Sequence, residues 1–374
     1  MHPKVVIIGG GYGGAAAARA LDAETDVTLI EPKDAFLHSV ATLRAAVRAD
    51  WASRIFIPYD KLLHRGRIVR DRAVRVEAMQ VSLRSGRQID ADYIVLATGS
   101  TYPFPAKTDL DDRDSAERKF RATSRELASV DRVLVLGAGP VGLELAGEIL
   151  AEWPKKHVVI VDPRADILGE YSDELRSEIH GQLRGFGAQL ILGSALAAEP
   201  STAPGVAGRF TVRTRTGVEI TADLWFRCYG ARAVTDYLAG DLAVARQPDG
   251  SIRVTADLRV EGQQAIFALG DITSIPESKK AKAAGLHAEV IAANIKALAA
   301  GSRHLSVYTP GPTSIVLPLG PNGGATQAPG IGVVGAEQTS RFKGADLNVD
   351  RFRTLLGYPA EAADECPVQK RKGQ

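Results

Sequence analysis

Short runs of β-branched and other apolar residues alternate with helical segments along the first part of the chain. The first run, Lys4 to Ile8, predicts a short buried strand. The segment Ala15 to Leu21 predicts a helix, and Val27 to Ile30 predicts a second strand. A strand, a helix and a strand in this order and at this length are typical of a β-α-β unit with parallel strands.

The turn between the first strand and the helix consists mostly of glycine. Gly9, Gly11 and Gly14 have the spacing of the dinucleotide-binding fingerprint. The first glycine permits a tight turn, the second lets a pyrophosphate approach the backbone, and the third lets the helix pack closely on the strand. The helix N-terminus offers free N–H groups to the phosphates. Glu31 ends the second strand, where a carboxylate can accept both ribose hydroxyls, so this unit is predicted to bind a dinucleotide.

The same arrangement recurs later in the chain. In order, it comprises a predicted strand (132–136), Gly137, Gly139 and Gly142, a predicted helix (143–152) and a strand (158–161) that ends at Asp162. Because all three glycines and the acid are present, the sequence predicts a second bound dinucleotide. The alternative is a repeat of the fold without a ligand.

Two further strands run into short polar motifs. A predicted strand over 93–96 leads into Ala97-Thr98-Gly99, and a strand over 265–269 leads into Gly270-Asp271. The order of fingerprint, Ala-Thr-Gly, fingerprint and Gly-Asp resembles the flavoproteins with two dinucleotide-binding domains. That resemblance implies that the Ala-Thr-Gly segment closes over an FAD domain. It also implies that the Asp271 carboxylate holds the ribityl and pyrophosphate region of FAD.

This order of motifs implies an α/β fold with two Rossmann-like domains in the glutathione-reductase-like order. The FAD-binding domain is expected at 1–110 and 240–300, the inserted NAD(P)H-binding domain at 111–239, and a small α+β C-terminal domain at 301–374. Residues 223–230 read as the exit strand of the inserted domain and 200–208 as a loop.

The C-terminal region gives weaker signals. Strands are expected at 314–319 and 332–334, and a helix at 349–356. The Gly-rich segment 320–335 predicts turns around a ligand or an interface, or else an ordinary hairpin loop.

Longer segments resemble the apoptosis-inducing-factor-type FAD/NAD(P)H oxidoreductases, and within them most closely the ferroptosis suppressor branch, which reduces quinones. The segments that carry this resemblance are 31–44, 97–105, 284–288 and 308–311. It covers nearly the whole chain and is looser after about residue 325. The lipidation signal at the N-terminus of the animal members is not found at Met1-His2-Pro3-Lys4, which is not a signal peptide either.

The resemblance implies an FAD-dependent oxidoreductase that takes a hydride from NAD(P)H and reduces a quinone-type acceptor in a ping-pong cycle. The two cysteines, Cys228 and Cys366, form no C-x-x-C dithiol, so electrons are expected to leave the flavin directly for a quinone or for dioxygen. Asp162 favours the 2′-hydroxyl of NADH over the 2′-phosphate of NADPH. Arg164 offsets part of this repulsion, so NADH is predicted to be preferred and NADPH to be usable.

Three residues are candidates for catalytic roles. Glu144 is expected beside the nicotinamide, with a simple helix first-turn acid as the alternative. Lys280 is expected to stabilise an anionic reduced flavin, unless it is one of three solvated lysines with Lys279 and Lys282. His38 is expected to donate a proton or hydrogen bond near the flavin or quinone, and a surface or structural histidine is the equal alternative.

Other residues are assigned to cofactor binding or packing. Arg44 balances FAD phosphate charge or forms a structural ion pair, and His287 is interpreted as helix packing. Tyr12, Phe36 and Tyr102 form a wall at the isoalloxazine or simply pack. The full predicted cofactor-binding set is Gly9, Gly11, Tyr12, Gly13, Gly14, Glu31, Pro32, Lys33, Arg44, Ala97, Thr98, Gly99, Gly137, Gly139, Pro140, Val141, Gly142, Asp162, Gly230, Gly270, Asp271 and Lys280, and no metal site is predicted.

Composition narrows the class of protein further. The chain has 374 residues, of which 45% are hydrophobic and 24% charged, and its net charge is +2, the balance of a globular enzyme without a nucleic-acid partner. Two cysteines exclude a disulfide scaffold, and no apolar run is long enough to span a membrane. A cytoplasmic monomer or homodimer is expected, with at most peripheral membrane contact through the basic tail Lys370-Arg371-Lys372.

Other functions remain open at this point. A reductase of a small redox protein would need a basic docking patch, which the near-neutral net charge does not favour. A specialised biosynthetic flavoenzyme would act on a quinone-like or aromatic metabolite. In a different class, a redox-gated interaction protein would sense NADH and turn over slowly with every acceptor.

Overall fold

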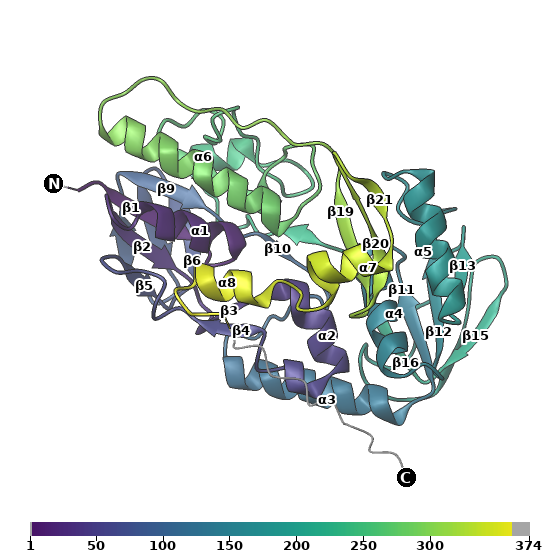
Figure 1. Cartoon of the computed structure of the whole chain (residues 1–374). Helices are drawn as coiled ribbons and strands as arrows, with labels where there is room; N and C mark the ends of the chain where they lie inside the picture. Colours follow the sequence, from purple (N-terminus) through teal and green to yellow (C-terminus); the bar gives the residue numbers. More distant parts are fainter. Residues whose placement is uncertain (1, 361–374) are drawn as a thin grey trace, which may run out of the picture.

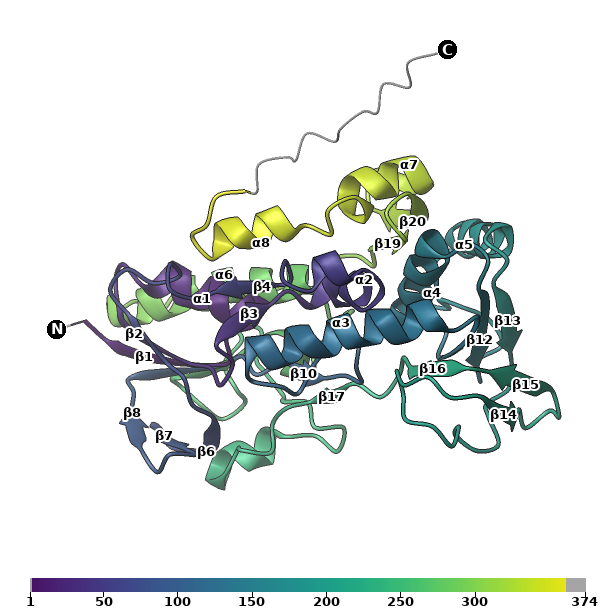
Figure 2. The same ribbon diagram turned by 90° about the horizontal axis from the view of Figure 1, so that it is seen from below.

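The computed structural model describes residues 2–360 (Figure 1). Cys366 and the predicted basic tail at 370–372 lie outside the described residues, as does the end of the predicted C-terminal domain. Two parallel sheets lie side by side, each with its own helices, and the C-terminal segments lie across the space between them (Figures 1 and 2). None of the helices within 2–360 is long and apolar enough to cross a bilayer.

The first sheet has five parallel strands in the order β18-β9-β1-β2-β5. Their bounds are Ile266–Ala268, Tyr93–Leu96, Lys4–Ile8, Asp26–Ile30 and Arg67–Val69. Ile8 of β1 is level with Ile30 of β2 and Leu96 of β9, and Leu96 is level with Ala268 of β18. The carboxyl ends of four strands therefore meet at one edge, where parallel sheets bind ligands. Because β18 comes from late in the chain, this unit is split in the sequence, as expected.

Alternating side chains of β1 pack on opposite faces of the sheet. Val5 and Ile7 pack under α1 (Tyr12–Leu21) and α6 (Ala281–Ala299), whereas Val6 and Ile8 face the meander of β6, β7 and β8. The meander strands are Ala73–Glu77, Gln80–Leu83 and Gln88–Asp90. An all-apolar strand is required because both faces of the sheet are covered.

Shorter elements connect this unit to the next. Strands β3 (Ala35–Leu37) and β4 (Phe56–Pro58), which precede and follow α2 (Thr42–Val47) in the sequence, pair with each other. Helix α2 packs on α3 (Arg113–Ser129). Figure 2 shows α3 running from beside the first unit toward the second. A short ribbon of β10 (Ser100–Thr101) and β17 (Arg232–Ala233) pairs the two connecting segments.

The second sheet repeats the plan with four parallel strands in the order β13-β12-β11-β16. The strands are Gln189–Leu192, His157–Asp162, Arg132–Leu136 and Leu224–Arg227, and the helices are α4 (Pro140–Glu152) and α5 (Asp173–Gly185). The antiparallel pair β14 (Phe210–Arg213) and β15 (Glu219–Ala222) covers the other face. The predicted exit strand is β16, and 200–208 is a loop, as predicted. The exact domain boundaries stay predictions.

The C-terminal unit contains an antiparallel sheet of β19 (Ile315–Leu319), β20 (Gly323–Ala328) and β21 (Gly332–Val334). The central strand β20 lies inside the Gly-rich segment for which only turns or a loop were expected. That expectation was wrong because the strand is composed largely of glycine and alanine, which carry almost no strand signal. After the sheet come α7 (Ala336–Thr339), a π-helical turn (Ser340–Gly344) and α8 (Val349–Leu355).

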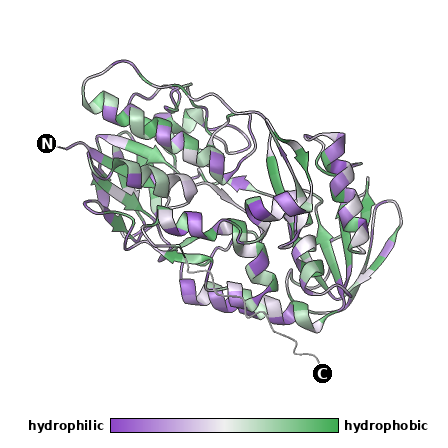
Figure 3. Ribbon diagram, in the orientation of Figure 1, coloured by the Kyte–Doolittle hydropathy of each residue, from purple (hydrophilic) through white to green (hydrophobic). Residues whose placement is uncertain are grey.

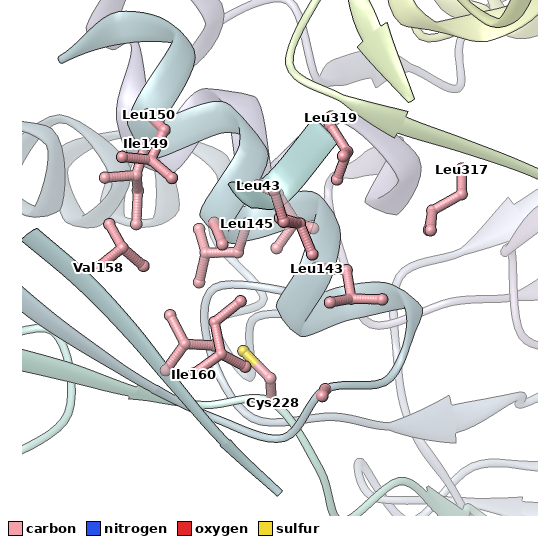
Figure 4. Packing of buried hydrophobic residues seen from close by; sticks show 14 of the residues in the cluster. Leu43, Leu143, Leu145, Ile149, Leu150, Val158, Ile160, Cys228, Leu317 and Leu319 are labelled. Atoms are coloured by element: carbon pink, nitrogen blue, oxygen red, sulfur yellow. The ribbon is translucent and has the colours of Figure 1, made fainter. Parts of the chain in front are cut away.

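This C-terminal sheet does not have a core of its own. Leu317 and Leu319 of β19 join the cluster formed by Leu143 and Ile149 of α4, and Leu43 of α2 joins it from the first unit (Figure 4). In Figure 3 the strands of the parallel sheets are mostly in the hydrophobic colours, whereas α5 is largely hydrophilic along its outer side. One apolar cluster therefore joins the second unit, the C-terminal sheet and α2 of the first unit.

Candidate functional site

The first glycine loop is fixed by close backbone packing. Gly9 has φ +103°, and a Cβ there would lie 2.5 Å from the Ala97 carbonyl oxygen. A Cβ on Gly14 would lie 1.8 Å from the Gly9 oxygen, so neither position tolerates a side chain. An added Cβ on Gly11, by contrast, has no atom within 4 Å. The loop thus presents bare backbone to open space at Gly11, at the N-terminus of α1, as phosphate binding requires.

A cavity of about 680 Å³ opens at this loop. Most of the predicted FAD-binding residues line it, although they come from five separate segments of the chain. These are Gly9, Gly11, Tyr12, Gly13, Glu31, Pro32, Lys33, Ala97, Thr98, Gly99, Gly270, Asp271 and Lys280. Gly14 does not line it, because it is used for the packing of α1 on the loop.

Glu31 lies at the end of β2 on the cavity wall and is buried. Its carboxylate accepts hydrogen bonds from the Gly10 N–H at 2.6 Å and the Lys33 N–H at 2.9 Å. Burial raises the pKa of Glu31 despite these two donors. Tyr59, which the sequence did not single out, donates its hydroxyl to the Gly10 carbonyl at 2.8 Å and so braces the same loop from the other side.

The Gly-Asp motif is held by residues that the sequence analysis missed. Ser100 donates to the Asp271 carboxylate at 2.5 Å, and the Lys107 ammonium lies 3.5 Å from the same oxygen. Burial lowers the pKa of Lys107, whereas its contact with Asp271 acts in the opposite direction. Thr98 donates to the Val234 carbonyl at 2.6 Å. Ser100 lies directly beside the Ala-Thr-Gly motif, and this is the one signal that could have found it.

The second glycine loop has the same construction. Gly137 has φ +110°, and a Cβ on Gly142 would lie 1.9 Å from the Gly137 oxygen. Asp162 at the end of β12 accepts from the Ala138 N–H at 2.7 Å, as Glu31 accepts from Gly10. Gly139 is partly exposed, and the nearest atom to a Cβ there would be an Arg164 side-chain nitrogen at 3.7 Å.

Arg164 pairs with Asp162 at both carboxylate oxygens. Its Nε lies 3.0 Å from one oxygen and its terminal nitrogen 3.0 Å from the other. Burial on its own would raise the pKa of Asp162, but hydrogen bonds from Arg164 and Ala138 hold that pKa below its ordinary value. The guanidinium is about half exposed. Positive charge therefore lies beside the loop where the second dinucleotide is expected.

A second cavity of about 1190 Å³ lies between α4, α6, α8 and the C-terminal sheet. Tyr12, Asp271 and Lys280 line both this cavity and the first, so the two meet at these residues. Pro140 and Val141, which follow the second glycine loop, also line the second cavity. Gly137, Gly139, Gly142, Asp162 and Gly230 line neither cavity. Both predicted nucleotide units thus reach a common space.

Glu144 lines the second cavity and is paired there with Lys343. The Lys343 ammonium donates to the carboxylate at 2.7 Å, and both side chains are largely buried. Burial raises the pKa of Glu144, and Lys343 counteracts part of that rise. The sequence analysis missed Lys343 because it comes from the π-helical turn in the C-terminal region.

Lys280 is the N-cap residue, directly before α6. Its ammonium lies 3.2 Å from the Tyr171 hydroxyl and also bonds the Ser314 carbonyl. Lys279 instead caps the Thr273 and Ile275 carbonyls at 2.7 and 2.9 Å, and Lys282 is exposed. Of the three lysines considered, Lys280 is the one that lines both cavities.

His38 and Arg44 line neither cavity. His38 is fully buried, with the Tyr12 hydroxyl 3.0 Å from Nδ1 and the Leu347 carbonyl 2.8 Å from Nε2. Burial lowers the pKa of His38 to about 4. Arg44 makes a buried two-point ion pair with Glu148, at 2.9 and 2.8 Å. For both residues the structure has the arrangement given as the alternative: a structural histidine and a structural ion pair.

Of the three aromatic candidates, two line the cavities and one is buried away from them. Tyr12 and Tyr102 line both cavities, whereas Phe36 is fully buried and packs edge-on against Tyr12 with centroids 5.3 Å apart. Cys228 is buried in the core of the second unit, and burial raises its thiol pKa to about 12. Its position agrees with a core residue.

The residues present fit FAD in the first cavity. The middle glycine and the N-terminus of α1 are open toward it, a carboxylate stands at the end of β2, and Asp271, which follows β18, also lines it. The loop N–H groups are donors for phosphate. Lys33 also lines the cavity, and its ammonium donates to the Leu110 carbonyl at 3.1 Å and lies 3.5 Å from the Asp111 carboxylate. The second loop, whose middle glycine is partly exposed beside Arg164, fits a second nucleotide.

Comparison with known proteins places these features in a family. The family model described as pyridine nucleotide-disulphide oxidoreductase matches residues 3–288. Ferroptosis suppressor protein 1 of Taeniopygia guttata is 32% identical over 364 residues, covering 95% of this chain and 96% of the relative. Apoptosis-inducing factor homolog B of Dictyostelium discoideum is 29% identical over 376 residues, covering 95% and 97%.

Solved structures share the fold at lower identity. The sulfide:quinone oxidoreductase of Aquifex aeolicus superposes with a TM-score of 0.74 at 19% identity, covering 96% of this chain and 93% of that one. NDH2 of Plasmodium falciparum in complex with NADH gives 0.73 at 13% identity, covering 91% and 93%. The predicted fold class is confirmed.

Proposed function

Because the chain belongs to the pyridine nucleotide-disulphide oxidoreductase family and resembles ferroptosis suppressor protein 1 over almost its whole length, we propose that it reduces a quinone with NADH. The coarser description, an FAD-dependent oxidoreductase that uses NAD(P)H, follows from the family itself. The overall reaction is NADH + H⁺ + quinone → NAD⁺ + quinol. We further propose a ping-pong order, in which NAD⁺ leaves before the quinone is reduced.

FAD supplies the two-electron carrier of this reaction when it is bound. The chain's own residues bind and orient it: the first glycine loop holds the pyrophosphate, Glu31 the ribose, and Asp271 the ribityl region. Lys280 and the N-terminus of α6 bring positive charge to the junction of the two cavities. We propose that this charge favours the reduced, anionic state of the site.

The Glu144–Lys343 pair is the observation that supports the proposal most directly. It places a carboxylate and an ammonium 2.7 Å apart in the second cavity, largely shielded from water. We propose that Glu144 orients the nicotinamide carboxamide by accepting from its amide. Lys343 holds a proton beside the acceptor, which needs one proton in addition to the hydride.

The second cavity also fits an apolar acceptor. Ile315 and Val316 of β19 and Phe352 and Leu355 of α8 line it, beside small residues of α1 and α6.

Cys228 is the free cysteine within the described part of the chain, and it is buried. No dithiol partner for it is present there, so a direct transfer to a small acceptor is the simplest route.

We propose that NADH is preferred because Asp162 stands where the 2′ position of the second nucleotide is expected. Arg164 already neutralises this carboxylate through two hydrogen bonds. The expected preference is therefore modest, and NADPH remains a substrate.

The experiment that tests the proposal is anaerobic stopped-flow on the flavin-loaded protein. The protein is reduced with NADH and then mixed with a short-chain ubiquinone or menaquinone analogue. Reoxidation much faster than by air supports a quinone reductase. Reduction by NADH without any response to quinone would refute it and leave a small redox protein or a dedicated metabolite as acceptor. Slow reoxidation by every acceptor would instead favour the NADH-sensing interaction protein.

A variant links this result to the site. Glu144→Ala should slow reduction by NADH by about 10- to 100-fold, because a positioning contact in a water-poor site is lost. Glu152→Ala, on the exposed end of the same helix, is the control and should not change the rate. An unchanged reduction rate in Glu144→Ala would remove Glu144 from the mechanism.

A further inference from the structure

A trio of polar side chains lies beside the Gly-Asp motif and has no role in the proposed reaction. It consists of His287 in α6, Glu277 in the loop before α6, and Tyr308 in the segment that leads to the C-terminal sheet. His287 is buried, and the Glu277 side chain is almost so. The three residues form a chain of contacts that ends on the backbone of Gly270.

The contact with Gly270 fixes the proton on the histidine. The Gly270 N–H donates to His287 Nδ1 at 3.0 Å, in a buried position. A backbone N–H is always a donor, so Nδ1 must carry a lone pair and the single ring proton must be on Nε2. Burial lowers the pKa of His287, whereas Glu277 acts in the opposite direction, and the neutral ring is the form that Gly270 requires.

The Nε2 side of the ring faces a carboxylate. Nε2 lies 2.8 Å from Glu277 Oε1, off the ideal line of a hydrogen bond. The other carboxylate oxygen accepts from the Tyr308 hydroxyl at 2.6 Å. The Tyr308 ring also packs edge-on against the His287 ring, with centroids 4.2 Å apart. The imidazole is therefore held in its plane by a charge on one side and an aromatic ring on another.

His287 holds Gly270 at its N–H, while the Gly270 carbonyl accepts from the Thr273 N–H and hydroxyl at 3.1 and 3.0 Å. Gly270 has φ +69° and begins the turn that carries Asp271, which faces the junction of the two cavities. The Asp271 carboxylate is in turn held by Ser100 at 2.5 Å. Any rotation of the Gly270 peptide would break its bond to Nδ1 and move Asp271 away from Ser100.

We propose that His287, held by Glu277 and Tyr308, is a positioning residue for FAD. It acts through the Gly270 N–H and sets the place of the Asp271 carboxylate. Tyr308 belongs to the segment that connects α6 to the C-terminal sheet. The same series of contacts therefore links the flavin site to the start of the C-terminal unit. The inference rests on the FAD site of the proposed function and is independent of the acceptor.

Two substitutions of His287 separate its contact with Gly270 from its contact with Glu277. In His287→Asn the amide oxygen takes the place of Nδ1 and still accepts from Gly270, but the contact with Glu277 is lost. In His287→Gln the amide reaches toward Glu277, and Gly270 loses its acceptor. Each variant apoprotein is titrated with FAD to give the dissociation constant, and the loaded protein gives the visible flavin spectrum and the reduction potential.

The expected result is an ordering of the variants. His287→Gln should weaken FAD binding by about tenfold, because a buried N–H is left without a partner, and should shift the flavin bands and the potential. His287→Asn should stay within about threefold of the unmodified protein, and its spectrum should be close to normal. Tyr308→Phe should show a smaller change in the same direction as His287→Gln. Leu286→Ala, an exposed neighbour on α6, is the control for the helix.

Two outcomes would overturn the proposal. One is FAD affinity, spectrum and potential in a folded His287→Gln that equal those of the unmodified protein. The other is equal impairment of the Asn and Gln variants together with a similar loss of apoprotein thermal stability, which indicates packing alone. If His287→Gln does not fold, His287→Leu, which also removes the acceptor of the Gly270 N–H, decides, and an unaltered FAD constant and spectrum there would refute the proposal. None of these measurements uses NADH or quinone, so failure of the quinone reductase proposal would leave them unaffected.

Discussion

The two glycine loops are built alike and surrounded differently. In each, the first glycine has φ near +100°, and the third would place a Cβ within 2 Å of the first glycine's oxygen: 1.8 Å for Gly14 and 1.9 Å for Gly142. In each, the acid that ends the second strand accepts from a loop N–H, at 2.6 Å for Glu31 and 2.7 Å for Asp162. Locally, the two devices are the same.

Their surroundings make the difference. Tyr59 braces the first loop, and the loop forms one wall of a cavity of about 680 Å³. The glycines of the second loop line neither of the two cavities described, and an exposed Arg164 pairs with its acid. The comparison teaches that one motif serves two purposes. A loop in a cavity wall suits a nucleotide that is retained, and a loop outside both cavities, beside an exposed charged side chain, suits a nucleotide that is exchanged in every cycle.

The largest effect is expected where the two units are joined. Arg44 of α2 and Glu148 of α4 form a buried ion pair, so Arg44→Met leaves Glu148 charged and without its partner. The free energy of unfolding should fall by about 3–5 kcal/mol. Urea unfolding measures it, and the double variant Arg44→Met/Glu148→Met should recover much of the loss. A single variant within 1 kcal/mol of the unmodified protein would show that the pair does not hold the units together.

The next prediction separates the two loops directly. Gly14→Ala and Gly142→Ala each force a carbonyl oxygen and a Cβ apart, at a cost of about 3 kcal/mol, or roughly 100-fold in binding. Gly14→Ala should purify without FAD. Gly142→Ala should keep its FAD and be reduced slowly by NADH. FAD content and anaerobic reduction rates test this, and loss of FAD from both variants would contradict separate sites.

A pH dependence should distinguish the units as well. Burial lowers the pKa of His38 to about 4, below the value of about 6.5 expected in the unfolded chain. Between these values the unfolded chain binds more protons, so the free energy of unfolding should fall as the pH drops from about 6.5 to about 4. The contribution of His38 is full above this range, and its loss amounts to about 3 kcal/mol.

Urea unfolding at several pH values measures this effect. In His38→Gln the slope between pH 6.5 and 4 should flatten. The exposed His157 of β12, in the second unit, provides the control His157→Gln, whose slope should match that of the unmodified protein. Equal slopes in the two variants would show that His38 does not titrate as its burial requires.

The smallest effect concerns the choice of nucleotide. Arg164→Gln removes the positive charge from Asp162 and should lower kcat/KM for NADPH by about tenfold, with less effect on NADH, a difference of about 1.4 kcal/mol. Asp162→Ala should narrow the preference for NADH. Arg213→Gln, an exposed arginine on β14 of the same unit, is the control. An unaltered ratio in both Arg164→Gln and Asp162→Ala would remove this pair from cofactor selection.

Much of the fold could be read from the sequence because its signals are local. The glycine spacing, the apolar strands and the terminal acids act over about 30 residues, and the strands and helices around them lie where they were predicted, within a few residues. The strand β20 was not predicted, because its Gly-Gly-Ala start gives no alternation of large apolar and polar side chains. Its place is set by pairing with β19 and β21.

The candidate site could be predicted only in part. The residues that line the first cavity belong to motifs with a fixed local geometry, so most of them were identified. His38 and Arg44 lie in a segment that was also assigned to the site, but their side chains point toward Leu347 and Glu148. Lys343 belongs to no motif considered, and it enters the second cavity because the C-terminal unit packs on α4.

The sequence by itself determined the two dinucleotide-binding units, because backbone turns with positive φ and close helix packing need glycine wherever the rest of the chain goes. Only the tertiary structure decided which charges meet. Arg44 and Glu148 are 104 residues apart, and Glu144 and Lys343 are 199 residues apart. Such pairs depend on how the three units pack on one another, and no local pattern records that packing.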